Sequence, residues 1–201
     1  MSGFRYLWAR AVTRFNPADR ARVQNIRLAT QKVDGKVLAP GATFSFNQAV
    51  GSRQSPESGF AAAPVFTDKG RVRALGGGVC QVSSTLYAAV LLTDLEVLER
   101  HAHAMPVPYL DPGLDATVSN RLDLRIRNPH PFAVQFRLSV HERRLQAEVW
   151  GEKPPSTRSR LMYRSNRCMR DGVSALQVTV WRLLPGGRRQ KMSEDIYYVG
   201  R

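Results

Sequence analysis

Cysteines, acidic residues and long apolar runs are scarce in this sequence of 201 residues, and each scarcity excludes a class of protein. Cys80 and Cys168 are too few and too far apart for a disulfide framework, so we expect a fold that does not depend on oxidation. No stretch approaches the length of a membrane-spanning helix, and residues 4–9 are too short for the apolar core of a signal peptide. We therefore expect a protein that stays in the cytoplasm, is exported by another route, or carries an upstream segment.

Only 16 acidic side chains oppose 30 Lys and Arg, for a net charge of +14. Residues 36–152 carry 12 basic and 11 acidic side chains, whereas residues 153–201 carry 11 and 3. Such a surface attracts polyanions: nucleic acid, anionic lipid or acidic cell-wall polymers. Because no nucleic-acid-binding module is recognisable, we rank nucleic acid below an anionic envelope polymer. The simpler alternative is that many of these arginines only solvate the protein.

What the sequence does contain is a glycine run that leads one cysteine into a predicted helix, at Gly76-Gly77-Gly78-Val79-Cys80-Gln81-Val82-Ser83-Ser84. Glycine lets the backbone pass close to a ligand, and a helix N-terminus stabilises a thiolate. Cys80 is therefore a candidate nucleophile. The candidate substrate contacts are its neighbours Gly76, Gly77, Gly78, Gln81, Ser83 and Ser84. The structural alternative is a tight turn before a helix that buries an unreactive cysteine, with the serines capping backbone donors.

Hydrophobic periodicity predicts helices near 17–34 and 81–95, the first capped by Asn16 and followed by Gly35. The first helix would bury one face, made of Val23, Ile26, Thr30 and Val33. Alternating apolar residues predict strands at 43–47, near Val72, and at 105–110, 122–126, 132–140 and 145–149. Hairpin turns are expected at 128–131 and 142–144, a linker at 153–157, and one more hairpin within 176–199.

A histidine and then an aspartate follow Cys80 along the chain. Thiol enzymes of the papain- and transglutaminase-like folds, in which a helix precedes an antiparallel sheet, have their catalytic residues in the same order. His103 would act as the base, Asp115 would orient its ring, and His101 is the reserve for either ring role. Backbone amides of the glycine run and the helix start would supply an oxyanion hole.

Other interpretations of these residues exist. On a strand, His101 and His103 would present both rings on one face, and with Cys80 and Asp115 they would make a zinc site. We nevertheless expect no metal and no cofactor. Asp115 follows a Pro-Gly pair and would also suit a turn. His130 and His141 are interpreted as surface residues, and Cys168 as structural, since it has no acid–base neighbours.

Several motifs then occur in order. They read NIRLA (25–29), PGATFSFN (40–47), VG (50–51), GGGVCQVSSTLY (76–87), ERHAH (99–103), PV (106–107), GLDATVS (113–119) and DLRIRN (123–128). Through them the chain resembles the VanW-like family, the vancomycin B-type resistance accessory proteins, over about residues 14–152. The resemblance implies a bacterial cell-envelope context, often beside peptidoglycan-binding modules, and its Gly-Gly-Gly-x-Cys-Gln and His-x-His segments fall on the residues selected above by chemistry.

We therefore predict an α+β fold with a papain- or transglutaminase-like core, in which the helix that carries Cys80 packs on an antiparallel sheet. Residues 1–152 would form the VanW-like domain and residues 153–201 a basic, β-rich C-terminal appendage. The predicted function is a cysteine-dependent hydrolase or acyltransferase that acts on peptide or amide bonds of cell-wall material. The competing hypothesis is a non-catalytic module that binds a cell-wall peptide or an anionic envelope polymer.

Overall fold

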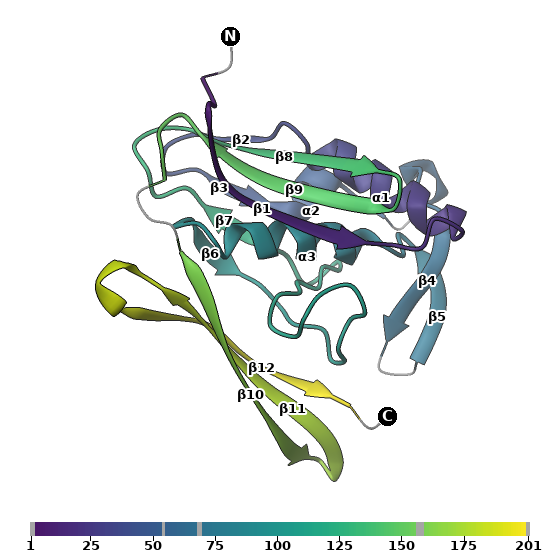
Figure 1. Cartoon of the computed structure of the whole chain (residues 1–201). Coiled ribbons are helices and arrows are strands. Elements are labelled where there is room, and N and C mark those ends of the chain that lie inside the picture. The colour runs from purple at the N-terminus through teal and green to yellow at the C-terminus, as the bar shows by residue number, and fades with distance from the viewer. Residues whose placement is uncertain (1–2, 54, 68–69, 156–158, 200–201) are drawn as a thin grey trace.

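The computed structural model describes residues 3–53, 55–67, 70–155 and 159–199 (Figure 1). The helices within these residues are α1 (Arg20–Val33), α2 (Phe46–Val50) and α3 (Val79–Val90), with 3₁₀ turns at Pro56–Ser58 and Pro185–Gly187. The strands are β1 (Tyr6–Arg14), β2 (Val37–Leu38), β3 (Thr43–Ser45), β4 (Ala62–Thr67), β5 (Gly70–Leu75), β6 (Glu96–Glu99), β7 (Arg125–Arg127), β8 (Val134–His141), β9 (Arg144–Gly151), β10 (Arg160–Arg170), β11 (Val173–Leu183) and β12 (Arg189–Tyr198). All the strand pairs are antiparallel, so the predicted α+β class is confirmed.

The central sheet has the strand order β1-β9-β8-β2, and α3 packs against β1 and β9 while α1 packs against β8 (Figure 1). The β8–β9 hairpin was predicted from its alternating pattern. Its turn contains Glu142 at φ 49°, and Phe136, Leu138, Leu145 and Ala147 are buried on the side that faces the core. The helix that carries Cys80 therefore packs on an antiparallel sheet, as predicted.

Strand β1 was not predicted, although it forms one edge of the central sheet. It alternates arginines with buried Trp8 and Thr13, and it exposes Tyr6, Leu7 and Val12. Charged residues on an edge strand protect it from pairing with other chains, and they also weaken its hydrophobic pattern. The strand was overlooked for that reason, yet it supplies contacts that fix α3.

Several predicted boundaries were wrong by a few residues, and in two cases a capping side chain sets the observed boundary. The first helix starts at Arg20, because the Asp19 carboxylate, and not Asn16, accepts from the backbone amide of Arg22 at 3.1 Å. The strand predicted at 43–47 ends at Ser45, whose hydroxyl caps α2. Helix α3 runs over Val79–Val90, and not over 81–95.

Two predicted β features are absent from segments that are fully described. Residues 105–110 form turns and no strand, because Pro106 and Pro108 have no N–H for a sheet ladder. The segment 128–131 is not a hairpin turn, because it joins β7, which lies between β3 and β6, to β8 of the central sheet. The Asn128 side chain fixes this crossing by donating to the carbonyls of Leu38, Ala39 and Phe132.

The C-terminal segment forms a three-stranded meander, β10-β11-β12, where a single hairpin was expected (Figure 1). Val178, Val180 and Tyr197 make its small core. The additional strand β10 carries Cys168. Residues 156 and 157 of the linker predicted at 153–157 lie outside the described residues, and 153–155 have no regular structure. The domain boundary at residue 153 stays a prediction.

Candidate active site

The glycine run is required by backbone geometry. Gly78 caps α3 in the left-handed conformation at φ 109°. A Cβ on Gly77 would lie 2.6 Å from the carbonyl oxygen of Ala63 and 2.8 Å from that of Pro64, so the loop packs directly on β4. This close approach is to the chain's own backbone, and it places Cys80 in the first turn of α3.

Gln81 fixes the start of α3. Its amide nitrogen donates to the Thr13 hydroxyl at 3.0 Å and to the Arg14 carbonyl at 2.9 Å, and its oxygen accepts from Arg22 at 2.9 Å. Gln81 thus joins α3 to β1 and α1, and its role as a substrate-binding residue stays a prediction.

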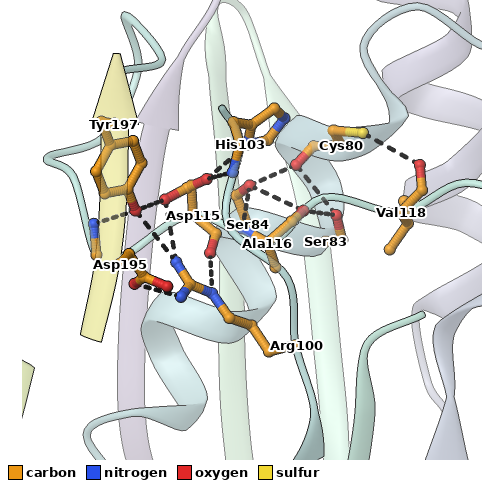
Figure 2. Close-up of polar contacts among 11 residues, drawn as sticks. Cys80, Ser83, Ser84, Arg100, His103, Asp115, Ala116, Val118, Asp195 and Tyr197 are labelled. Carbon is orange, nitrogen blue, oxygen red and sulfur yellow. Dashed lines mark hydrogen bonds and ion pairs between the residues drawn. The ribbon is translucent and has the colours of Figure 1, made fainter. Parts of the chain in front are cut away.

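Ser83 and Ser84 are fully buried, which contradicts their predicted contact with substrate. The Ser84 hydroxyl donates to the Cys80 carbonyl at 2.6 Å and accepts from the Ala116 amide at 2.9 Å, while Ser83 donates to the Ala116 carbonyl at 2.7 Å. These serines therefore hold the segment that carries Asp115 against α3 (Figure 2).

The structure brings Cys80, His103 and Asp115 together, as Figure 2 shows. His103 Nδ1 lies 2.6 Å from Asp115 Oδ2, and the same oxygen accepts from the His103 backbone amide at 2.7 Å. The other ring nitrogen of His103 is turned toward Cys80 (Figure 2). The Cys80 thiol donates to the Val118 carbonyl at 3.4 Å.

His101 does not join this group. Residues 101–103 are not in a strand, so the expected presentation of both rings on one face was wrong. His101 Nε2 bonds Glu99 at 3.0 Å, and 39% of its side chain is exposed. Within the described residues no cluster of three His, Cys, Asp or Glu side chains is arranged to hold a metal ion.

The environment favours a thiolate–imidazolium pair. Burial lowers the pKa of His103, but the hydrogen bonds to Asp115 and to the Cys80 sulfur outweigh it and raise the pKa to about 9. Burial raises the pKa of the Cys80 thiol, but His103 and the positive charge of Arg53 outweigh it and hold that pKa below its ordinary value. Each charge of the pair stabilises the other, as in activated cysteine nucleophiles.

Asp115 is completely buried and is held by residues that the sequence did not indicate. The Tyr197 hydroxyl donates to its Oδ1 at 2.5 Å, and Arg100 pairs with it at 3.1 Å (Figure 2). Burial raises the pKa of Asp115, but the hydrogen bonds from His103 and Tyr197 and the charge of Arg100 lower it below its usual range. Asp195 in turn accepts from Arg100 at 2.5 Å. Only Arg100, beside the His-x-His segment, could have been noticed in the sequence.

Cys80 and His103 line a cavity of about 570 Å³. The described residues around it also include Gly76, Gly78, Gln81, Arg22, Arg53, Pro64, Val65, Leu75, Val79, Val107, Tyr109, Thr117, Val118, Ser119 and Asn120. Of the predicted contacts, Gly77, Ser83 and Ser84 do not line it. Its volume lies within the range of cavities that bind small molecules.

Two backbone amides at the start of α3 are left for an oxyanion. The amides of Gly76, Gly77, Val79 and Gln81 all donate to backbone carbonyls at 3.0 to 3.4 Å. Among the described residues the amides of Gly78 and Cys80 have no such partner outside the helix. The oxyanion hole proposed for the glycine run and the helix start therefore reduces to the amides of Gly78 and Cys80.

His130 and His141 lie outside the site. His141 is exposed, as expected, but His130 is not a surface residue. The His130 ring stacks on Phe132 with ring centroids 4.9 Å apart, contacts Trp8 edge-on, and bonds Asp94 at 2.9 Å. The prolines on either side of His130 suggested an exposed turn, and nothing in the sequence indicated that its ring packs on Phe132 and Trp8.

Comparison with known proteins shows which family the chain matches. The profile described as VanW like protein matches residues 21–150. The Bacillus subtilis (strain 168) protein YoaR, described as uncharacterized, is 42% identical over 120 residues, which cover 59% of this chain and 39% of YoaR. The vancomycin B-type resistance protein VanW of Enterococcus faecalis (strain ATCC 700802 / V583) is 31% identical over 144 residues, 67% of this chain and 50% of that protein.

The chain thus spans half or less of the length of these two relatives. No solved structure matches it. In the part of the chain that is described, no helix has the length and apolar character needed to cross a membrane. Since the matched stretch includes Cys80, His103 and Asp115, the chain belongs to the VanW-like family.

Proposed function

We propose that this protein is a cysteine-dependent hydrolase or acyltransferase that acts on peptide or amide bonds of cell-wall material in the bacterial envelope. The observation that carries the proposal is the His103–Asp115 contact of 2.6 Å, with the second ring nitrogen directed toward Cys80 at an open cavity. The chain order Cys–His–Asp, and a nucleophile helix packed on an antiparallel sheet, support a papain- or transglutaminase-like core.

In this proposal the Cys80 thiolate bonds to the carbonyl carbon of the substrate amide, and the carbonyl electron pair moves to oxygen beside the Cys80 amide. The carbon–nitrogen bond breaks as the leaving nitrogen takes the proton from His103 Nε2. The acyl group stays on sulfur as a thioester. Water, or an amine in the transferase case, then loses a proton to His103 and attacks the thioester, and the carbon–sulfur bond breaks to restore the thiolate.

Asp115 acts through His103 in this scheme. Its carboxylate holds Nδ1 in its protonated form, so that Nε2 faces the sulfur and exchanges protons there. The raised pKa of His103, about 9, keeps the ring charged and able to protonate a leaving amine near neutral pH. His101 has no part in the proposed mechanism, because its ring is paired with Glu99.

Cell-wall material is proposed as the target because of the family. One relative is named for vancomycin B-type resistance, and the net charge of +14 suits an anionic envelope. The second candidate function is a non-catalytic module in which the same cavity binds a cell-wall peptide. The hydrogen bond from the Cys80 thiol to the Val118 carbonyl favours it, because this contact uses the protonated form of the sulfur.

Purified peptidoglycan distinguishes the two functions. We expect the protein to release new amino groups from it, detected by amine labelling and mass spectrometry, and we expect Cys80→Ala to release none while still sedimenting with the polymer. His141→Gln, an exposed histidine outside the site, should leave the release unchanged. Sedimentation by both proteins with no amine release by the wild type would instead establish the binding module.

A further inference from the structure

The wall of the cavity that contains Cys80 carries cationic side chains and no carboxylate. The described residues around it include Arg22, Arg53 and His103, and they include no Asp or Glu. The opposite charges are the Cys80 thiolate in the cavity and two carboxylates behind its wall, Asp115 on His103 and Asp123 near Arg53. A carboxylate group that enters this cavity therefore meets arginines on the wall and no other carboxylate.

Arg53 has a hydrogen-bond donor to spare inside this cavity. Its Nη2 donates to Asn47 Oδ1 at 3.0 Å, whereas its Nη1 is shielded from solvent and has no partner among the described residues. The Asn47 amide group donates to the carbonyls of Ser119 and Leu122 at 2.9 Å, so Arg53 bonds to a fixed acceptor. A buried guanidinium nitrogen without a partner is costly, and a ligand that accepts from it removes that cost.

The nearby chain is adapted to the Arg53 side chain. A Cβ on Gly76 would lie 3.2 Å from Arg53 Cδ, so the first glycine of the run makes room for this arginine. The Asp123 carboxylate near Arg53 is held by other donors: its oxygens accept from the Ser45 hydroxyl at 2.5 Å and from the Asn47 backbone amide at 2.9 Å.

Arg22 and Thr117 also belong to the polar lining. Arg22 is already bonded to Gln81, and its guanidinium lies 6.0 Å from the centre of the Tyr109 ring. The Thr117 hydroxyl, like Arg53 Nη1, is buried without a hydrogen-bond partner among the described residues. Two buried donors of the lining residues, one on a guanidinium and one on a hydroxyl, are thus unused, and a carboxylate has two oxygens that could accept from them.

We propose that Arg53 binds a carboxylate of the substrate, so that Cys80 acts on peptides with a free carboxylate close to the bond under attack. This inference rests on the proposed function, since it names the substrate class of the same site. A carboxylate is favoured over a phosphate because one buried guanidinium nitrogen and one buried hydroxyl suit planar recognition at two points.

Two alkylating agents of nearly equal size test the proposal without a substrate. Iodoacetate carries a carboxylate and iodoacetamide the neutral amide, and both attack the same thiolate. The quantity measured is the rate with iodoacetate divided by the rate with iodoacetamide. We expect this ratio to be about tenfold higher at Cys80 than for the glutathione thiol, which is the effect of one charge-assisted hydrogen bond. Arg53→Gln should return the ratio to the glutathione value. Arg121→Gln, an exposed arginine outside the cavity lining, removes the same charge and should not change it.

Because the ratio cancels any change in the thiolate fraction, it separates this inference from the proposed function. A Cys80 that resists iodoacetamide overturns both proposals. A reactive Cys80 whose ratio equals that of glutathione, or is unchanged in Arg53→Gln, overturns the carboxylate site alone.

Protection of Cys80 from iodoacetamide then identifies the anion. N-acetyl-alanyl-alanine, tested with both L and D residues, should slow labelling in at least one form, and its carboxamide should not. Inorganic phosphate is the competing anion. Protection by phosphate as strong as that by the peptide would overturn the assignment to a peptide carboxylate.

Discussion

Asp115 is the residue on which the charge of the site depends. A fully buried carboxylate is tolerated here because it accepts from the His103 ring and backbone, from the Tyr197 hydroxyl and from Arg100. It therefore stays ionised and keeps His103 positively charged, and the imidazolium in turn lowers the pKa of Cys80. Three titratable groups act as one coupled unit.

This coupling predicts how Cys80 labelling depends on pH. Since its thiol pKa is lowered, the rate of iodoacetamide labelling should reach half its maximum below the ordinary thiol value of about 8.5, and it should fall only as the pH drops through that lower value. His103→Gln removes the imidazolium, so the midpoint should move upward and labelling at pH 7 should slow. Mass spectrometry of both cysteines over a pH series measures this.

The exposed His141 provides the matched control, because His141→Gln changes the same side chain far from the sulfur. Cys168 in the same sample reports the labelling of a cysteine with no histidine partner. A midpoint for Cys80 that His103→Gln leaves unchanged would show that the imidazole does not stabilise the thiolate.

At the same scale, the sequence indicated three candidate residues that the structure brings together, and it missed those that surround them. Cys80, His103 and Asp115 occur in motifs whose chemistry is recognisable from residue type and order. Arg53 lies in a polar loop, and its importance depends on the packing of Gly76 and on a hydrogen bond to Asn47, neither of which leaves a pattern in the sequence.

Strand β12 is the element that connects the C-terminal sheet to the site. Its Tyr197 is fully buried, donates to Asp115 and accepts from the Gly113 amide at 2.7 Å. Gly113 itself lies against β11, where a Cβ would come within 2.5 Å of Val180. The C-terminal sheet therefore packs closely on the loop that presents Asp115.

Removing one hydroxyl tests this connection. Tyr197→Phe leaves Asp115 Oδ1 without one donor and the buried Gly113 amide without its acceptor, so we expect the free energy of unfolding to fall by about 1–3 kcal/mol. Iodoacetamide labelling of Cys80 should slow several-fold, because a less restrained carboxylate holds His103 less well. Denaturant unfolding and the labelling rate measure the two effects.

Tyr198→Phe is the control from the same strand. The Tyr198 hydroxyl donates to Asp171 at 3.0 Å at an exposed position, so its loss should change stability by about 0.5 kcal/mol or less. If Tyr197→Phe and Tyr198→Phe have the same free energy of unfolding and the same Cys80 labelling rate, Tyr197 does not support the site, and its hydrogen bond to Asp115 contributes little to stability.

Elements with regular patterns could be predicted from the sequence, and those fixed by distant contacts could not. The β8–β9 hairpin and helix α3 follow their apolar periodicity. In contrast, the apolar stretch 105–110 predicts a strand, but its two prolines have no N–H for a sheet ladder. Strand β1 has no clear apolar pattern, because its arginines face solvent at the edge of the sheet. Its contribution to the site comes from the contacts of Thr13 with Gln81 and Thr85 of α3, which are distant in the sequence.

For the whole molecule, the site draws on residues from most of the chain. Thr13 and Tyr197 lie outside residues 21–150, the stretch that matches the family, yet the first anchors α3 and the second holds Asp115. Deleting residues 153–201 would remove Tyr197 and expose the surface around Asp115. A test of the basic C-terminal segment must therefore change its surface charge and leave its strands intact.

The charge excess of the C-terminal segment predicts where the protein adsorbs to anionic surfaces. Arg160, Arg164 and Arg170 are exposed, and their even spacing places them on one face of β10. Replacing all three with Gln should weaken binding to vesicles that contain phosphatidylglycerol and reduce the loss of binding as salt is added, because fewer charges are screened.

Replacing the exposed Arg121, Arg143 and Arg144 with Gln is the control. It removes the same charge from the family-matched part and should have a smaller effect. Co-sedimentation over a salt series measures both variants. Equal losses in the two would mean that net charge alone drives adsorption, and the C-terminal sheet would then have no special part in it.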